Sequence, residues 1–179
     1  DFNLSLNDLL KGSLIRLKRF MSHGSKDILI KSVIQALLTY TMSIFKMSVG
    51  FREQYEKTVC DFWWDDEQNH RRVHLMSSEK MTQRKFHGGP GFRDMQVFNQ
   101  ALLTKQSWSL VWRPESLCAR ILKSKYYPSV YFLDMIFASN VSHMWREIEF
   151  GLELLKKGVV WRVGNGNSIQ IFRDSWISR

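Results

Sequence analysis

Two segments of this sequence hold residue types that could bind phosphate or a catalytic metal ion. The first, Gly88-Gly89-Pro90-Gly91, precedes Asp94 and a stretch with helical periodicity. A glycine loop ahead of a helix can bind phosphate through backbone N–H groups. However, no Lys-Ser/Thr pair follows this loop, no buried strand precedes it, and the Asp94 carboxylate would repel phosphate. We therefore interpret the loop as a turn followed by a helix N-cap.

The second segment is the acidic run Asp65-Asp66-Glu67, which lies close to His70 and His74. Paired carboxylates can hold two Mg²⁺ ions for phosphoryl transfer. Here, however, the run follows a predicted helix in a polar loop, and we interpret it as solvated. The two histidines lack the further ligands of a four-ligand zinc site. The sequence therefore predicts no metal site and no cofactor.

The two cysteines, Cys60 and Cys118, are the remaining candidates for covalent chemistry. Because no Gly-x-Ser-x-Gly segment is present and each cysteine lies on a predicted helix, we interpret both as core residues. Two distant cysteines favour a reducing compartment, so we expect an intracellular location, nuclear or cytoplasmic. The apolar stretch 28–47 is interrupted by polar residues, so we expect no membrane span. The chain is predicted not to be an enzyme by itself.

Positive charge is the main functional signal of the composition. The chain carries 26 Lys+Arg and 17 Asp+Glu, a formal net charge of +9, and residues 1–50 and 94–179 contribute +4 each. Such an excess favours polyanionic partners, and neighbouring aromatic rings could stack on bases. A solvated helix face would give the same pattern. The candidate nucleic-acid-binding residues are Lys11, Arg16, Lys18, Arg19, Lys26, Lys31, Arg120, Lys123 and Lys125, with a further basic group at Lys156, Lys157 and Arg162.

Helical periodicity covers most of the chain. Helices are expected over about 4–20, 26–47, 51–64, 78–83, 95–112, 117–126 and 143–157. Their expected N-caps include Ser25, Asp94, Ser116 and Ser142, and their expected stops are Pro114, Pro128 and Gly158. Residues 129–141 fit neither a helix nor a strand clearly.

The apolar pattern also predicts which face of each helix is buried. The helix over 26–47 is expected to bury Ile30, Val33, Ile34, Leu37, Leu38, Thr41, Ile44 and Phe45, with Lys31 and Gln35 opposite. The helix over 51–64 is expected to bury Phe51, Tyr55, Val59, Phe62 and Trp63. The helix over 95–112 is expected to bury Val97, Phe98, Ala101, Leu102, Trp108 and Val111. The helix over 143–157 is expected to bury Trp145, Ile148, Leu152 and Leu155.

The period of the apolar pattern changes near the C-terminus. Residues 159–163 and 168–172 are β-like, and Gly164-Asn165-Gly166-Asn167 between them is typical of a hairpin turn. The predicted fold class is therefore mainly α, a helical bundle-like body over 1–158. A C-terminal β-hairpin over 159–179 would begin a truncated downstream unit.

Several short segments, spread over nearly the whole chain, match a known family in their order and spacing. They are 20–33, Phe62-Trp63-Trp64, 88–94, 98–103, 122–128, Trp145-Arg146, 154–158, 161–166 and Asp174-x-Trp176-Ile177. Together they resemble the region just downstream of the polymerase palm in plant LINE-type (non-LTR) retrotransposon reverse transcriptases.

This resemblance implies a thumb-like helical region that connects the palm to the downstream domains of the polyprotein. In that family the palm, with its Tyr-x-Asp-Asp type turn, lies upstream, and zinc-ribbon-like and RNase H regions lie downstream. The implied role is non-catalytic binding of a template–primer duplex, RNA–DNA or DNA, through its phosphate backbone. The implied partner is the upstream polymerase palm of a full-length parent protein.

The chain also departs from the family pattern. Residues 74–78 lack both tryptophans of the usual His-Trp-x-x-Trp, Leu38 stands where a proline is usual, and Pro90 replaces a leucine. These losses motivate a first alternative, a decayed retroelement remnant. The abundant tryptophan and phenylalanine motivate a second, a helical protein-interaction module without nucleic-acid function.

Overall fold

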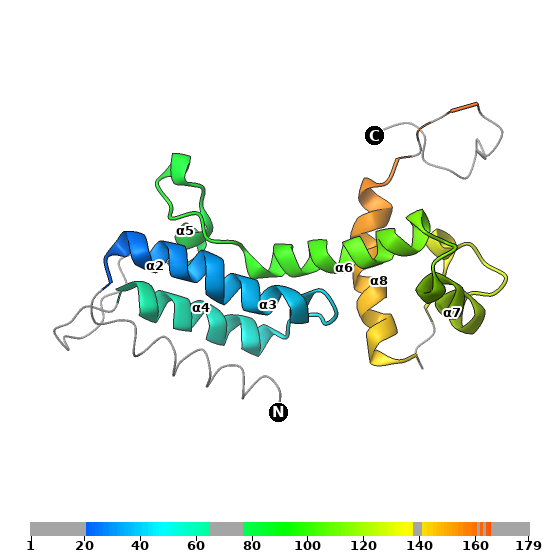
Figure 1. Ribbon diagram of the computed structural model, residues 1–179, viewed down its shortest axis with the longest axis horizontal. Helices are drawn as coiled ribbons and strands as arrows, with labels where there is room; N and C mark the ends of the chain where they lie inside the picture. The colour runs from blue at the N-terminus through cyan, green and yellow to red at the C-terminus, as the bar shows by residue number, and fades with distance from the viewer. Residues whose placement is uncertain (1–20, 65–76, 138–140, 161, 163, 166–179) are drawn as a thin grey trace. The chain divides into compact units, whose positions relative to one another are not determined.

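The computed structural model describes residues 21–64, 77–137, 141–160, 162, 164 and 165, which form helices joined by turns (Figure 1). The chain separates into two compact units, Asp1–Asn99 and Gln100–Arg179. The first contains α2 (His23–Leu29), the π-helical turn η2 (Ile30–Ile34), α3 (Gln35–Met42), α4 (Val49–Trp64), α5 (Ser78–Thr82), the 3-10 turn η3 (Lys85–His87) and the start of α6 (Met95–Trp112). The second contains the rest of α6, α7 (Leu117–Tyr126), the 3-10 turn η4 (Phe132–Asp134) and α8 (His143–Gly158). The mainly helical prediction is confirmed.

Most predicted helix ends agree with the structure to within two residues. The expected helices over 51–64, 95–112, 117–126 and 143–157 correspond to α4, α6, α7 and α8. The first described helix differs, because it begins at His23 with Ser22 as the N-cap rather than Ser25. The Ser22 hydroxyl accepts a hydrogen bond from the Ser25 backbone N–H at 3.3 Å. Local capping chemistry therefore explains most of these boundaries.

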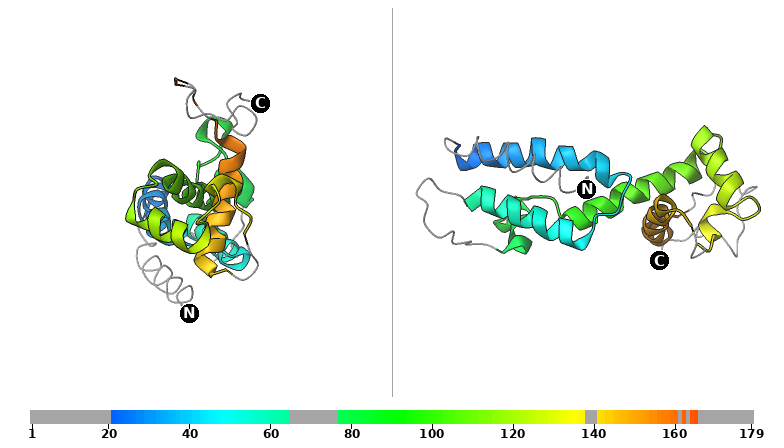
Figure 2. Two further views of the ribbon diagram at one scale, coloured as in Figure 1. Left: turned by 90° about the vertical axis from the view of Figure 1, so that its right-hand side faces the viewer. Right: turned by 90° about the horizontal axis from the view of Figure 1, so that it is seen from below.

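In the first unit, α2, η2 and α3 form one continuous helical run, and α4 packs along it in the opposite direction (Figures 1 and 2). The core between them contains Ile30, Ile34, Leu38 and Met42 from the run and Phe51, Tyr55, Val59 and Phe62 from α4. The buried face predicted for α4 is thus confirmed for these four residues. In the run, by contrast, Gln35 is buried, and Val33 and Leu37 are exposed. The π-helical turn lies within this run and accompanies this change of face.

Asn99 fixes the connection between α3 and α4. Its amide donates hydrogen bonds to the backbone carbonyls of Met42, at 2.7 Å, and Phe45, at 2.9 Å. Its side-chain oxygen accepts from the Met47 backbone N–H at 2.8 Å. These three bonds satisfy backbone groups in the connection, so the helix ends at Met42 and not at residue 47 as predicted.

The core of the second unit is built around Trp145, which is 1% exposed. Leu110 of α6, Ala119 of α7, Phe132 of η4 and Leu152 of α8 belong to the same buried cluster. Residues 129–141, whose structure the sequence left open, thus contribute η4 to this core. Large rings therefore hold the three helices of this unit together.

The predicted C-terminal β-hairpin is not supported. Residues 159, 160 and 162 have no regular structure, and the described residues of the chain contain no strand. Residues 161, 163 and 166–179, which would complete the hairpin, lie outside the described residues, as does the predicted helix over 4–20. The proposed division at residue 158 coincides with the end of α8 and stays a prediction.

Candidate nucleic-acid interface

Three of the predicted binding residues, Arg120, Lys123 and Lys125, are exposed on α7. An α-helix advances by about 100° per residue. Arg120 and Lys123 therefore share one side of α7, whereas Lys125 emerges roughly 140° around the helix from Arg120. Neither Arg120 nor Lys123 has an ion-pair partner among the described residues. Both side chains are therefore available for a phosphate.

Packing on the opposite side of α7 fixes this orientation. Ser116 caps the helix, since its hydroxyl accepts from the Ala119 backbone N–H at 3.2 Å. Ala119 is 2% exposed. The Tyr126 ring stacks on Trp145, with ring centroids 4.4 Å apart and planes 9° apart. Because these contacts bury one face of α7, its cations must point away from the core.

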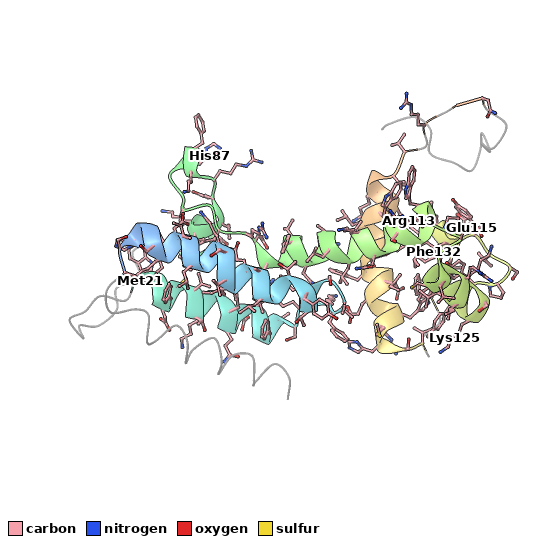
Figure 3. The ribbon with its side chains drawn as sticks, viewed as in Figure 1. Met21, His87, Arg113, Glu115, Lys125 and Phe132 are labelled. Carbon is pink, nitrogen blue, oxygen red and sulfur yellow. The ribbon has the colours of Figure 1, made fainter. Side chains whose placement is uncertain are left out.

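Lys125 is held at the C-terminal end of α7 (Figure 3). Its ammonium lies 5.1 Å from the centre of the Tyr126 ring. The Tyr126 hydroxyl and the Ser142 hydroxyl form a hydrogen bond of 3.0 Å. This bond first, and the nearby Lys125 second, lower the pKa of Tyr126. The last turn of a helix also favours a cation, so Lys125 has a preferred position before any ligand arrives.

The positive charge extends beyond the predicted residues into α6. Residues 100–126 contain five basic side chains and one acidic side chain, Glu115, a net charge of +4, whereas residues 127–179 carry +1. Lys105 and Arg113 are exposed, like the three cations of α7 (Figure 3). Sequence reasoning missed these two residues, although a charge count over this shorter window would have found them. The charge of the second unit is therefore concentrated on its first two helical segments.

The two described candidates of the first unit, Lys26 and Lys31, are engaged within the unit. Lys26 is 5% exposed, and its ammonium donates to the Trp63 carbonyl at 3.5 Å, in the last turn of α4. Lys31 donates to the Pro90 carbonyl at 2.8 Å, and its ammonium lies 5.4 Å from the centre of the Phe92 ring. Their contact with nucleic acid stays a prediction.

Asp27 joins two of the cations of the first unit. Its carboxylate lies 2.6 Å from the Lys31 ammonium and 3.3 Å from that of Lys85. Burial by itself would raise the pKa of Asp27, but the hydrogen bonds and charges of Lys31 and Lys85 outweigh it, so the pKa lies below its ordinary value. The carboxylate is therefore ionised at neutral pH and neutralises part of the charge of this region.

Several predicted residues lie outside the described part of the chain. They are Lys11, Arg16, Lys18 and Arg19 of the binding set, and Asp65, Asp66, Glu67, His70 and His74 of the rejected metal segment. Within the described residues, no group of three or more His, Cys, Asp or Glu side chains could hold a metal ion. No helix in the same residues is long and apolar enough to cross a membrane.

The glycine loop is a turn followed by an N-cap, as predicted. Gly88 and Gly91 have positive φ values of 81° and 73°, which favour glycine. A Cβ on Gly89 would lie 2.3 Å from the Gln83 carbonyl oxygen. The Asp94 carboxylate accepts from the backbone N–H groups of Gln96 and Val97 at 2.9 and 3.1 Å. These N–H groups are thus occupied by a side chain of the protein itself.

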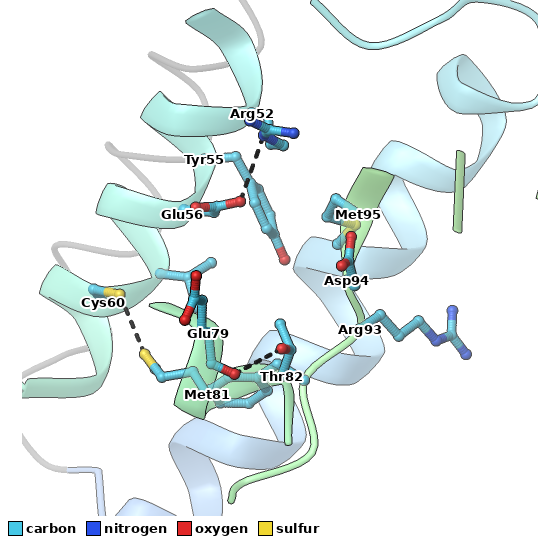
Figure 4. A pocket seen from close by; sticks show the side chains of 12 residues that line it. Arg52, Tyr55, Glu56, Cys60, Glu79, Met81, Thr82, Arg93, Asp94 and Met95 are labelled. Carbon is cyan, nitrogen blue, oxygen red and sulfur yellow. Dashed lines mark hydrogen bonds and ion pairs between the residues drawn. The ribbon is translucent and has the colours of Figure 1, made fainter. Parts of the chain in front are cut away.

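A cavity of about 280 Å³ lies between α4, α5 and the start of α6 (Figure 4). The Tyr55 side chain points into it. Neither the Tyr55 hydroxyl nor the Gln35 amide nitrogen has a hydrogen-bond partner among the described residues. Burial raises the pKa of Tyr55, and nearby Gln35 offsets only part of the rise. The phenol is therefore neutral, and the cavity offers no ionised nucleophile.

The two cysteines differ in environment. Cys60 is buried, with its sulfur 3.2 Å from that of Met81, and burial raises the pKa of its thiol (Figure 4). The core interpretation is confirmed for Cys60. Cys118 is exposed, so the same interpretation was wrong there. It follows Leu117 on the solvent side of α7, because Ala119 occupies the buried position of that turn.

The described helices and their exposed cations define a mainly helical, basic class of protein. The chain is 35% identical over 143 residues, which are 79% of its length and 93% of the relative's, to "Uncharacterized mitochondrial protein AtMg00310" of Arabidopsis thaliana. This chain belongs to the family of that protein.

A second relative is a much longer protein. The chain is 26% identical over 164 residues to "Putative ribonuclease H protein At1g65750" of Arabidopsis thaliana. The match covers 90% of this chain and 26% of that protein, so the chain corresponds to about a quarter of its length. No family model matches the chain, and no solved structure matches it.

Proposed function

We propose that this chain is a non-catalytic, retroelement-derived region that binds the phosphate backbone of a template–primer duplex. It would correspond to the thumb and connection of a non-LTR reverse transcriptase. The observation that carries this proposal is the net charge of +4 on residues 100–126, whose five cations are all exposed. Exposed cations without acidic partners can neutralise phosphates and release counterions.

The relatives support the retroelement part of this proposal. One relative is named for ribonuclease H, a nuclease, and this chain matches only 26% of it. A region of that kind fits a helical connection within a larger protein that acts on nucleic acid. The polymerase palm, with its catalytic aspartates, is assigned to an upstream part of such a parent protein.

The geometry of α7 favours backbone binding over base reading. Arg120 and Lys123 are one helical turn apart, about 5 Å along the axis. This distance is close to the spacing of successive phosphates along a strand, and phosphate contacts position a protein without reading sequence. The nuclear or cytoplasmic location stays a prediction, and the mitochondrial name of one relative adds a third compartment to test.

A salt titration of binding to an RNA–DNA duplex tests the proposal. The logarithm of the affinity should fall with the logarithm of the salt concentration, with a slope of about −0.9 per neutralised phosphate. The triple variant Arg120→Ala, Lys123→Ala, Lys125→Ala should weaken binding and reduce the slope by up to about 3. Binding that ignores salt would contradict the proposal.

A matched control separates local contact from total charge. Lys57, Lys80 and Arg84 are exposed and lie outside every candidate group. Their triple alanine variant removes the same charge and should leave the affinity and the slope close to those of the wild type. Equal losses in both triple variants would show that total charge attracts the duplex and that α7 does not contact it.

A helical protein-interaction module is the second candidate function. It is favoured by large apolar side chains that are strongly exposed, among them Phe86 at 94% and Ile136 at 93%. Large exposed apolar patches often mark protein interfaces. Saturable binding to a protein partner that competitor RNA does not reduce would favour this function over the first.

The decayed-remnant alternative makes a different prediction, since a remnant need not fold. The described helices have paired caps and buried cores, and we expect the chain to unfold in a cooperative thermal transition. A broad, non-cooperative loss of helical signal would favour the remnant.

A further inference from the structure

Two tryptophans of the second unit are stacked on each other and exposed to solvent. Trp108 and Trp112 lie four residues apart on α6, with ring centroids 5.7 Å apart and planes 19° apart. Their exposed fractions are 39% and 68%. Tryptophan is usually buried to a large extent, so this pair calls for a physical explanation.

The packing of α6 against α8 turns the pair outward. Ser107 is fully buried and its hydroxyl donates to the Ile148 carbonyl at 2.9 Å. The Thr104 hydroxyl donates to the Gly151 carbonyl at 3.1 Å. A Cβ on Gly151 would lie 2.4 Å from the Leu103 carbonyl oxygen, so the two backbones are in close contact there. This contact fixes the rotation of α6 and leaves no room for an indole on that side.

The surroundings of the pair are basic. Lys105 lies three residues before Trp108 and so shares its face of the helix. Arg113 follows Trp112 directly, and both cations are exposed. The only acidic side chain of residues 100–126 is Glu115. A protein partner with an acidic surface or a nucleic acid would suit this charge, and flat indole faces beside cations suit bases in particular.

We propose that Trp108 and Trp112 form a stacking platform for an unpaired base of nucleic acid. The exposed Trp112 ring receives the base, Trp108 supports it from behind, and Lys105 and Arg113 hold the adjoining phosphates. This inference rests on the proposed function and adds to it a single-stranded segment next to the duplex bound by α7. Because every base has a flat face, the platform does not select sequence.

The test compares two RNA–DNA duplexes that differ only in their single-stranded extension. One extension carries normal bases and the other consists of abasic nucleotides, so both offer the same phosphates. Affinities are measured at one salt concentration on the full chain. We expect the wild type to bind the base-bearing extension about tenfold more tightly than the abasic one.

Variants assign this preference to the rings. Trp112→Ala should abolish the preference for bases, and Trp112→Phe should retain most of it because a flat ring remains. Leu117→Ala is the matched control, since Leu117 is an exposed apolar residue of α7 at 71% and carries no aromatic ring. It should leave the preference unchanged. A wild type that binds both extensions equally, or a Trp112→Ala variant that keeps the preference, would overturn the platform.

The outcomes separate this inference from the proposed function. Binding to a blunt duplex without any preference for bases keeps the proposed function and removes the platform. A preference for bases without binding to a blunt duplex keeps the platform and removes duplex binding by α7. If Trp112→Ala abolishes self-association or binding to a protein and the wild type shows no base preference, the rings form a protein interface and the platform is wrong.

Discussion

The two units of the chain use their positive charges differently. In the described part of the first unit, Lys26 and Lys31 reach backbone carbonyls of the same unit, and Lys31 pairs with Asp27. In the second unit, Arg120 and Lys123 are exposed on a helix whose other face is packed against Trp145. Equal basic residues in a sequence can therefore stabilise a fold in one region and remain available to a ligand in another.

The largest effect on this comparison should come from Trp145→Ala. The substitution removes the ring on which Tyr126 stacks and should destabilise the protein by about 3–5 kcal/mol, because the site is fully buried. The exposed cations of α7 would lose their fixed orientation. Thermal unfolding measures the stability, and a change below about 1 kcal/mol would contradict the central role of this ring.

Gly151→Ala should have the next largest effect. The added methyl group would lie 2.4 Å from the Leu103 carbonyl oxygen, so α6 and α8 must separate. We expect a destabilisation of about 1–3 kcal/mol in thermal unfolding. Gly158→Ala is the control, because its Cβ meets nothing within 4 Å. Equal stability of the two variants would argue against the close helix contact that turns Trp108 and Trp112 outward.

Two lysine and arginine substitutions compare the units directly. Lys31→Met removes an ion pair and a hydrogen bond to Pro90 while keeping most of the stem, and should cost about 1–2 kcal/mol of stability. Arg120→Met removes an exposed charge and should change the stability by less than about 0.5 kcal/mol. Chemical denaturation measures both. If Arg120→Met destabilised the protein as much as Lys31→Met, the distinction between the units would fail.

The smallest expected effect concerns pH. Because the pKa of Asp27 in the folded protein lies below its ordinary value of 3.8, its contribution to stability is present above that value. The contribution is lost as the pH falls through the folded pKa. The stability difference between wild type and Asp27→Asn should therefore be largest near neutral pH and shrink below about pH 4. A difference that does not depend on pH would contradict the ionised pairing.

Much of the helical architecture could be predicted from the sequence, because its signals are local. Ser116 caps α7, and Asp94 caps α6 through two backbone N–H groups. Pro114 and Pro128 interrupt helical periodicity. Such signals act within a few residues of the chain. The exposed cations of α7 were predicted for a similar reason, since a Lys or Arg on an amphipathic helix usually faces water.

The wrong predictions concern which face of a helix is buried. The sequence predicted that Trp108 and Val97 lie on the inner face of α6, yet both are exposed, while Asn99 and Ser107 are buried. The two polar residues point inward because each bonds backbone groups of another segment. Apolar periodicity cannot reveal these partners, since they are more than 40 residues away in the sequence.

By itself, then, the sequence determined the positions of most helices, the basic character of residues 100–126 and the absence of a glycine phosphate loop. The tertiary structure alone decided the rotation of α6, through Asn99, Ser107 and the contact of Gly151 with Leu103. It also decided which cations are engaged, because Lys31 meets Pro90 only after folding. Helix positions depend on neighbours in sequence, whereas helix faces and free charges depend on neighbours in space.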